Sequence, residues 1–298
     1  DKVDYKLSRE KGENVGTYTI TPTGDEKQGN YKVTYKPGSL TIVAAQRTTE
    51  LSVTSYSGVY DAADHTITVN GTVDGDKVEY SYDGGKTWVT DLEKYTNVTE
   101  GSVAIQVKVT NKNYTLAETI LSGNVEITPA TLTVETPSQS KVYDGNALTA
   151  EGSITGFVNE ETATFTTTGS QTEVGNSENT YTLTWDGTAE KTNYTVSESL
   201  GTLTVTPQSI VPDPDPENPN PDYKDVEVST PADVPYNGQD QTWKPTVKDA
   251  EGKALVKDTD YTVSYDKDDR TNVTGIITVT ITGKGNYTGT VTRTYQIT

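Results

Sequence analysis

The chain of 298 residues has no cysteine and no methionine, only one histidine, and only two phenylalanines. Without cysteine there can be no disulfide and no zinc or iron–sulfur site with a thiolate ligand. A Ser-His-Asp triad would depend entirely on His65, which stands beside Asp64 without a nucleophile elbow. We therefore interpret His65 as an exposed loop residue and expect no enzyme activity. No run of 18 apolar residues is present, so no membrane-spanning helix is expected.

Positive charge is also scarce. Lys and Arg number 24 against 43 Asp and Glu, which gives a net charge of −19. An acidic surface repels phosphate backbones, so nucleic acid is not an expected partner. Hydrophobic residues make up 31% of the chain, which predicts several thin, separate cores. Helical periodicity is weak and allows at most a single turn at residues 91–94.

Two motifs recur along the chain and divide it into repeats. The front motif is a tyrosine followed by Asp or Asn after an apolar strand, and it occurs at Tyr60, Tyr143 and Tyr236. The second motif is Asn-Tyr followed by an alternating strand. Its copies are Asn30-Tyr31, Asn113-Tyr114, Asn193-Tyr194 and Asn286-Tyr287. An Asn-Tyr motif without a front motif predicts that the chain starts with the second half of a repeat.

These motifs predict a partial repeat at residues 1–45 and full repeats at 46–129, 130–207 and 223–298. Between the last two, residues 208–222 form a proline-rich linker. Proline fixes φ and extends its predecessor, so the linker is expected to be a polyproline-II spacer.

Within a repeat the pattern is that of short strands and turns. Residues 103–109 alternate apolar and polar side chains, and Asp83-Gly84-Gly85-Lys86 is a hairpin turn. Six or seven such strands in roughly 80 residues predict an all-β fold of tandem immunoglobulin-like β-sandwich repeats in an elongated array. A β-grasp domain is the alternative, but it needs a helix. Residues 14–18 resemble the tyrosine corner of immunoglobulin domains, with counterparts at 174–175 and 273–275.

The chain resembles the MBG-type and related immunoglobulin-like repeats of bacterial surface adhesins. The residues that carry the resemblance are the Tyr143-Asp144-Gly145 front, Val15-Gly16-Thr17-Tyr18, the Asn-Tyr motifs and the closing strand Gly201-Thr202-Leu203-Thr204-Val205. The second repeat departs from the pattern at Tyr60-Asp61-Ala62, which lacks the glycine. The resemblance implies tandem stalks or adhesive arrays in large cell-wall-attached proteins.

Aromatic residues are the candidates for ligand binding. Trp88 and Tyr82 flank the hairpin turn, and Trp243 lies in the last repeat. Sugars stack on such rings, but large aromatics also fill thin cores, and both interpretations stay open. Asp213, Asp215 and Glu217 resemble a calcium loop, but the intervening prolines disfavour wrapping around an ion. The Asn-Tyr sites satisfy the glycosylation pattern, yet we interpret them as turn residues that tolerate positive φ.

The expected function is therefore a non-catalytic stalk or adhesive array of a bacterial cell-surface protein. The chain is expected to be monomeric, to carry no cofactor and no metal, and to lie outside the cell on a Gram-positive wall. Two alternatives remain: direct binding of host mucin, glycan or extracellular-matrix protein, and an accessory role in a secreted carbohydrate-active enzyme. Binding would be expected from the atypical second repeat, through Trp88.

Overall fold

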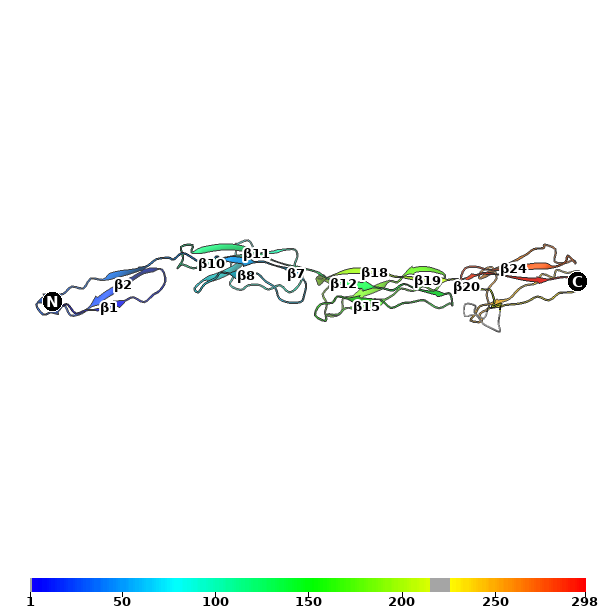
Figure 1. Cartoon of the computed structure of the whole chain (residues 1–298), viewed down its shortest axis with the longest axis horizontal. Coiled ribbons are helices and arrows are strands. Elements are labelled where there is room, and N and C mark those ends of the chain that lie inside the picture. The colour runs from blue at the N-terminus through cyan, green and yellow to red at the C-terminus, as the bar shows by residue number, and fades with distance from the viewer. Residues whose placement is uncertain (1, 215–225) are drawn as a thin grey trace. The chain divides into compact units, whose positions relative to one another are not determined.

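The computed structural model describes residues 2–214 and 226–298 (Figure 1). All regular structure in this part is β-strand, apart from a three-residue 3-10 helix, η1 (Lys191–Asn193). The predicted all-β, immunoglobulin-like class is confirmed, and residues 91–94, where the sequence allowed at most a single helical turn, form no helix. Two compact units are present. Unit 1 comprises residues 1–130, 157–160 and 190–195, and unit 2 comprises 131–156, 161–189 and 196–298.

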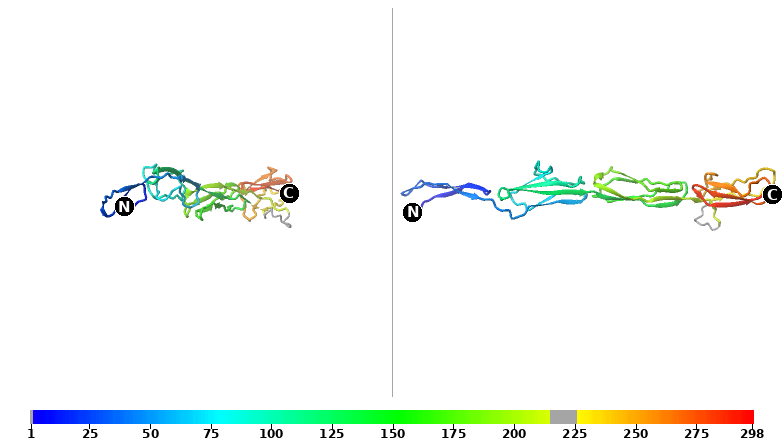
Figure 2. Two further views of the ribbon diagram at one scale, coloured as in Figure 1. Left: turned by 60° about the vertical axis from the view of Figure 1, so that its left-hand side comes forward. Right: turned by 90° about the horizontal axis from the view of Figure 1, so that it is seen from above.

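Unit 1 begins with the partial repeat. It forms one three-stranded sheet, β1-β2-β5, and a short hairpin, β3-β4, from β1 (Lys6–Arg9), β2 (Gly16–Thr23), β3 (Lys27–Gln28), β4 (Tyr31–Lys32) and β5 (Gly38–Ile42). Figure 2 shows this segment as a single layer of strands. One face of the sheet carries Leu7, Tyr18, Ile20 and Leu40, and Leu7 and Leu40 are exposed. Half a repeat has no second sheet to cover this face.

The second repeat completes unit 1. Its strands are β6 (Ser52–Thr54), β7 (Tyr56–Val59), β8 (Thr68–Asn70), β9 (Lys77–Ser81), β10 (Val103–Thr110) and β11 (Glu118–Thr128). They form a four-stranded sheet, β7-β11-β10-β9, and a pair, β6-β8. As the alternation in the sequence predicts, Ile105, Val107 and Val109 of β10 all point into the core.

Unit 2 contains most of the third repeat and all of the fourth. The third repeat has β12 (Ala130–Glu135), β13 (Gln139–Val142), β14 (Ser153–Thr155), β15 (Thr164–Thr167), β16 (Gly175–Glu178), β17 (Tyr181–Thr184), β18 (Tyr194–Ser199) and β19 (Thr202–Thr206). Its sheets are β14-β12-β18, β13-β19-β16 and β15-β17. The closing strand β19 pairs in parallel with the early strand β13, as β11 does with β7 in the second repeat.

The fourth repeat starts inside the predicted linker. Its strands are β20 (Gln208–Ser209), β21 (Glu227–Val228), β22 (Val247–Lys248), β23 (Tyr261–Tyr265), β24 (Ile277–Gly283), β25 (Tyr287–Thr288) and β26 (Thr290–Tyr295). β20 pairs in parallel with β25, and the following Ile210 is fully buried. Residues 208–210 therefore pack into the repeat, while residues 215–222 of the predicted spacer lie outside the described residues, as do Asp215 and Glu217.

The expectation of separate thin cores is wrong for unit 2. Most of its buried apolar side chains, though not Leu132 and Val134, form one cluster that includes Leu203 of the third repeat and Ile210 and Ile281 of the fourth. The cluster is continuous because the tyrosines of two motifs, Tyr143 and Tyr287, both belong to it. The two repeats of this unit therefore share a core at their junction.

Candidate functional site

The asparagines of three of the four Asn-Tyr motifs, Asn113, Asn193 and Asn286, contact the preceding repeat. In unit 1, the backbone N–H of Val15 donates to Asn113 Oδ1 at 2.9 Å. The same bond joins Val98 to Asn193, also at 2.9 Å. In unit 2, Val174 donates to Asn286 Oδ1 at 2.9 Å.

The side-chain amide of the same asparagine makes a second bond to the residue before that valine. Asn113 Nδ2 donates to Asn14 Oδ1, and Asn193 Nδ2 donates to Asn97 Oδ1, each at 2.9 Å. Asn286 Nδ2 donates to Glu173. Asn30, Asn113 and Asn286 lie in turns, as predicted, although none of the motif asparagines has positive φ. Asn113, Asn193 and Asn286 each link two repeats through two hydrogen bonds.

The tyrosines of the two motifs meet at the same places. Tyr60 packs edge-on against Tyr194 with ring centroids 5.6 Å apart, at an interplanar angle of 79°. Tyr143 and Tyr287 repeat this arrangement at 5.6 Å and 80°. An edge-to-face pair at this separation is the favourable geometry for aromatic rings. All four rings are buried, with exposed fractions of 3–8%.

Where the preceding repeat has no front motif, a cation takes the place of the ring. Tyr114 follows the partial repeat, and the guanidinium of Arg47 lies 4.8 Å from its ring centroid. Arg47 also forms an ion pair with the buried Asp76, whose other partners include Asn111. At this junction the cation–π contact with Arg47 covers the ring of Tyr114, as a second tyrosine covers the ring at the other two junctions.

A buried carboxylate also holds the tyrosine in unit 2. Tyr287 donates its hydroxyl to Asp249 Oδ2 at 3.0 Å, and both side chains are buried. Burial, and then the hydrogen bond to Asp249, raise the pKa of Tyr287 well above its ordinary value. The backbone N–H groups of Glu251 and Lys253 donate to the other oxygen of Asp249. Two contacts therefore hold Tyr287 in place: the edge-to-face packing with Tyr143 and the hydrogen bond from its hydroxyl to Asp249.

The predicted hairpin of the second repeat forms, and its turn is tightly bonded. Tyr80 and Val89 pair across it, and Asp83 accepts hydrogen bonds from Ser81 and from the backbone and side chain of Thr87. These bonds, the Thr87 hydroxyl first, hold the pKa of Asp83 well below its usual range.

Trp88 is half-buried, because the ammonium of Lys108 lies over its ring at 4.4 Å from the centroid. Lys108 is in turn paired with Glu79 at 3.3 Å. Tyr82 is also half-buried, and its hydroxyl accepts a hydrogen bond from the backbone of Glu93 at 2.6 Å. The structure thus brings Trp88 and Tyr82 to one hairpin, with a cation over the indole.

Trp243 belongs to unit 2, in the fourth repeat. It packs against the core of unit 2, and its carbonyl accepts the hydroxyl of Tyr265 at 2.5 Å. Trp185 of the third repeat is half-buried. The core-filling interpretation fits Trp243 better than it fits Trp88.

His65 is less exposed than expected, with 15% of its side chain accessible. Its ring stacks on Tyr56 at 3.8 Å, and Nε2 lies 2.8 Å from Asp61 Oδ1. The bond to His65 is the main cause of a lowered pKa at Asp61. Within the described residues, no group of three His, Asp or Glu side chains could hold a metal ion.

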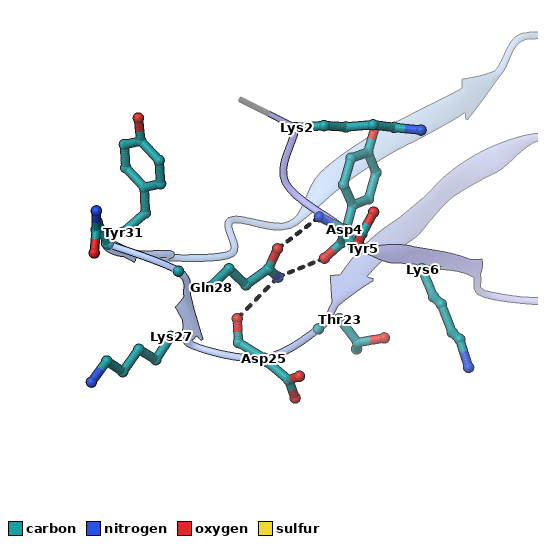
Figure 3. A pocket seen from close by; sticks show the side chains of 12 residues that line it. Lys2, Asp4, Tyr5, Lys6, Thr23, Asp25, Lys27, Gln28 and Tyr31 are labelled. Carbon is teal, nitrogen blue, oxygen red and sulfur yellow. Dashed lines mark hydrogen bonds between the residues drawn. The ribbon is translucent and has the colours of Figure 1, made fainter.

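A broad surface depression of about 970 Å³ lies at the outer hairpin of the partial repeat (Figure 3). Gln28 spans its floor, accepting from the backbone N–H of Asp4 and donating to the carbonyls of Asp4 and Asp25. Tyr31 and Lys27 line its rim. The side chains of Lys27 and Tyr31 are exposed, and the side-chain amide of Gln28 is already hydrogen-bonded to backbone groups. We therefore see no arrangement of catalytic groups among these three side chains.

The predicted corner is also present. Tyr18 donates its hydroxyl to the carbonyl of Asn14 at 2.7 Å, immediately before the valine that bonds to Asn113. Sequence reasoning found two counterparts of this loop, at Val174 and Val273, but missed Asn97-Val98 because no glycine follows there. The Asn-Val pair itself was the signal that could have found it.

Residues 1–41 and 132–204 match the MBG domain family of the YGX type. The predicted resemblance is confirmed for these two segments, and they contain the partial repeat and the centre of the third. Repeat domains of this all-β type are typically non-catalytic and extracellular. The comparison with curated proteins found no match. No helix in the described part of the chain is both long and apolar enough to cross a membrane.

Solved structures of other multidomain β-proteins show distant similarity. The titin I9–I11 tandem is 11% identical over 84% of this chain and 99% of its own, with a TM-score of 0.29. Protocadherin gamma B2 cadherin domains 3–6 are 7% identical over 95% and 83%, with a TM-score of 0.27. SGBP-B of the Bacteroides ovatus mixed-linkage glucan utilization locus, solved in complex with a mixed-linkage heptasaccharide, is 14% identical over 85% of this chain and 69% of its own, with a TM-score of 0.19. Scores this low carry no argument about function.

Proposed function

We propose that this chain is a non-catalytic repeat region, a stalk or adhesive array, of a bacterial cell-surface adhesin-like protein. The observation that carries the proposal is the recurring junction: an asparagine of one MBG-type repeat bonds to the valine loop of the repeat before it, in three places. A catalytic domain has no need for the same contact at every repeat. A load-bearing or spacing element does, because each junction restricts bending in the same way.

The mechanism follows from how the contact is made. Each asparagine uses both its carbonyl oxygen and its amide, so a hinge motion at the junction breaks two hydrogen bonds together. The paired tyrosines exclude water beside these bonds. The short parallel strands β20 and β25, which pair Gln208 with Tyr287, add backbone hydrogen bonds beside the Asn286 contact. Localisation on the outside of a bacterial cell, on a Gram-positive wall, is part of this proposal, and so is a monomeric state.

Small-angle scattering tests the stalk proposal. We expect the distribution of interatomic distances of the intact chain to be that of an elongated particle. This distribution should broaden when Asn113 and Asn286 are both replaced by alanine, because the freed junctions bend over a wider range of angles. Asn30→Ala is the matched control, because this exposed motif asparagine follows no described repeat. A compact profile, or identical profiles for the double variant and the intact chain, would contradict a role in restricting bending.

A second candidate function is direct binding of host mucin, glycan or matrix protein by the hairpin of the second repeat. Trp88 and Tyr82 support it, because a half-buried indole beside a tyrosine offers a ring face to a sugar. The indole already has Lys108 over it, which favours an acidic glycan that could bond to the ammonium. Retention of a polysaccharide by this repeat alone would instead favour the accessory role in a carbohydrate-active enzyme.

A glycan array and immobilised mucins test this candidate. Binding that Trp88→Ala abolishes, and that Trp243→Ala leaves intact, would make the second repeat an adhesive module. Trp243 is a suitable control because it packs against the core of a different repeat. No binding by a folded sample would leave the structural role as the better account.

A further inference from the structure

The fourth repeat carries an exposed copy of the surface that the earlier repeats bury. Each front-motif tyrosine donates its backbone N–H to the last threonine of its own repeat: Tyr60 to Thr128, Tyr143 to Thr206 and Tyr236 to Thr298, all at 2.8 Å. The three tyrosines therefore hold the same backbone position. Their rings differ, because Tyr60 and Tyr143 are 5% and 8% exposed, whereas Tyr236 is 55% exposed.

The valine loop shows the same contrast. Val15, Val98 and Val174 are half-buried and give their N–H groups to a motif asparagine. Val273, in the corresponding loop of the fourth repeat, is 63% exposed. Among the described residues, its backbone N–H makes no hydrogen bond.

The residue before the valine completes the correspondence. Asn14 and Asn97 each accept the side-chain amide of a motif asparagine. Asn272 occupies this position in the fourth repeat, and it is exposed. Tyr236, Asn272 and Val273, which we name the terminal edge, thus offer a ring, an amide oxygen and a backbone N–H in the pattern that the other junctions use.

We propose that the terminal edge binds the Asn-Tyr edge of another MBG-type repeat that is joined to it covalently. Continuity with the internal junctions identifies the occupant. Asn193-Tyr194 and Asn286-Tyr287 each cover a tyrosine ring, a valine N–H and a side-chain oxygen, which belongs to Asn97 in the first case and to Glu173 in the second. The proposal deepens the proposed repeat-array function and rests on it.

Covalent attachment follows from the size of the contact. To a separate chain, the terminal edge offers two hydrogen bonds and one ring pair, a contact far smaller than the roughly 1,600 Å² that stable complexes of separate proteins bury. Separate chains would also lose translational and rotational freedom, which a tethered repeat does not lose again. The acidic charge of −19 on every copy further opposes association between chains.

The sequence offers a direct test, because the ends of the repeats align. Thr128 is followed by Pro129, and Thr206 by Pro207, so a copy of residues 129–207 can be appended directly after Thr298 in the natural register. Hydrogen exchange of the Val273 amide is the readout, and the naturally bonded Val98 amide is the reference. We expect exchange at Val273 to slow by about tenfold, the factor of one hydrogen bond of ordinary net strength.

Two substitutions in the extended chain make the test specific. Tyr236→Ala, and replacement of the copied Asn193 by alanine, should each restore fast exchange at Val273. A second extension that carries residues 207–298 applies the same test with Asn286-Tyr287, should the first copy not fold. Unchanged exchange at Val273 beside a folded copy would overturn the proposal.

Hydrogen exchange of the unextended chain at low and high concentration distinguishes binding by a second chain from binding by a covalently joined repeat. Protection of Val273 that rises with concentration would mean that a second chain binds the edge, and would overturn the covalent partner. Failure of the repeat-array function would be seen elsewhere, as glycan binding that depends on Trp88. The two proposals can therefore fail independently.

Discussion

Tyr143 and Tyr236 have the same motif and the same backbone bond, but opposite burial. We expect Tyr143→Ala to destabilise unit 2 by about 3–4 kcal/mol, because truncating a buried aromatic side chain costs about 3–5 kcal/mol and the residue is 8% exposed. About 0.5–1.5 kcal/mol of this is the edge-on contact with Tyr287 itself. Tyr236→Ala in the unextended chain should cost no more than about 0.5 kcal/mol, as is usual for surface substitutions.

Urea unfolding followed by tryptophan fluorescence measures the difference, with Trp88 replaced by phenylalanine in every variant so that only Trp185 and Trp243 report. These indoles lie in the third and fourth repeats, so a coincident transition would also show that the shared core unfolds cooperatively. With an m-value of about 2 kcal/mol/M, the midpoint for Tyr143→Ala should fall by about 1.5–2 M. Equal midpoints for the two variants would refute the reasoning, since they would mean that the Tyr143–Tyr287 contact contributes nothing to stability.

Three further predictions concern single groups. Asn113→Ala should speed hydrogen exchange of the Val15 amide by about tenfold, because that N–H loses its acceptor, and an unchanged rate would mean that the bond does not form in solution. Tyr287 has a raised pKa, so its contribution to stability is complete below pH 10 and is lost as pH rises above it; Tyr287→Phe should flatten this alkaline loss in pH-dependent urea titrations. At neutral pH the same substitution should cost about 1–3 kcal/mol, because Asp249 loses a buried donor. Trp88→Ala should leave the unfolding midpoint of unit 2 unchanged, and a shift would show coupling that the hairpin contacts do not explain.

Local patterns predicted the elements of the fold well. The alternation in residues 103–109 places Ile105, Val107 and Val109 on one face because successive strand side chains point to opposite sides. The Asp83 turn and the Tyr18 corner were also predictable, since both depend on bonds between residues close in the chain. The MBG-type resemblance depends on such local motifs as well, and the family match confirms it over residues 1–41 and 132–204.

The function of the Asn-Tyr motif was not predictable in the same way. Its asparagines contact residues 95–112 positions away, across a repeat boundary. A turn residue, a glycosylation acceptor and an interdomain link have the same local sequence, so the pattern could not choose among them. The contact of Lys108 with Trp88 was not predictable for a related reason, because Trp88 lies just after the hairpin turn whereas Lys108 lies on the later strand β10.

By itself, then, the sequence determined that the chain is β-structured, acidic and repetitive, and which side chains face a core. These properties depend on composition and on a period of two, which a single strand already contains. Only the tertiary structure decided that the two motif tyrosines pair, that the third and fourth repeats share a core, and that Tyr236 is left exposed. These are contacts between segments far apart in the chain, and they exist only once each segment has folded and its partner has been brought beside it.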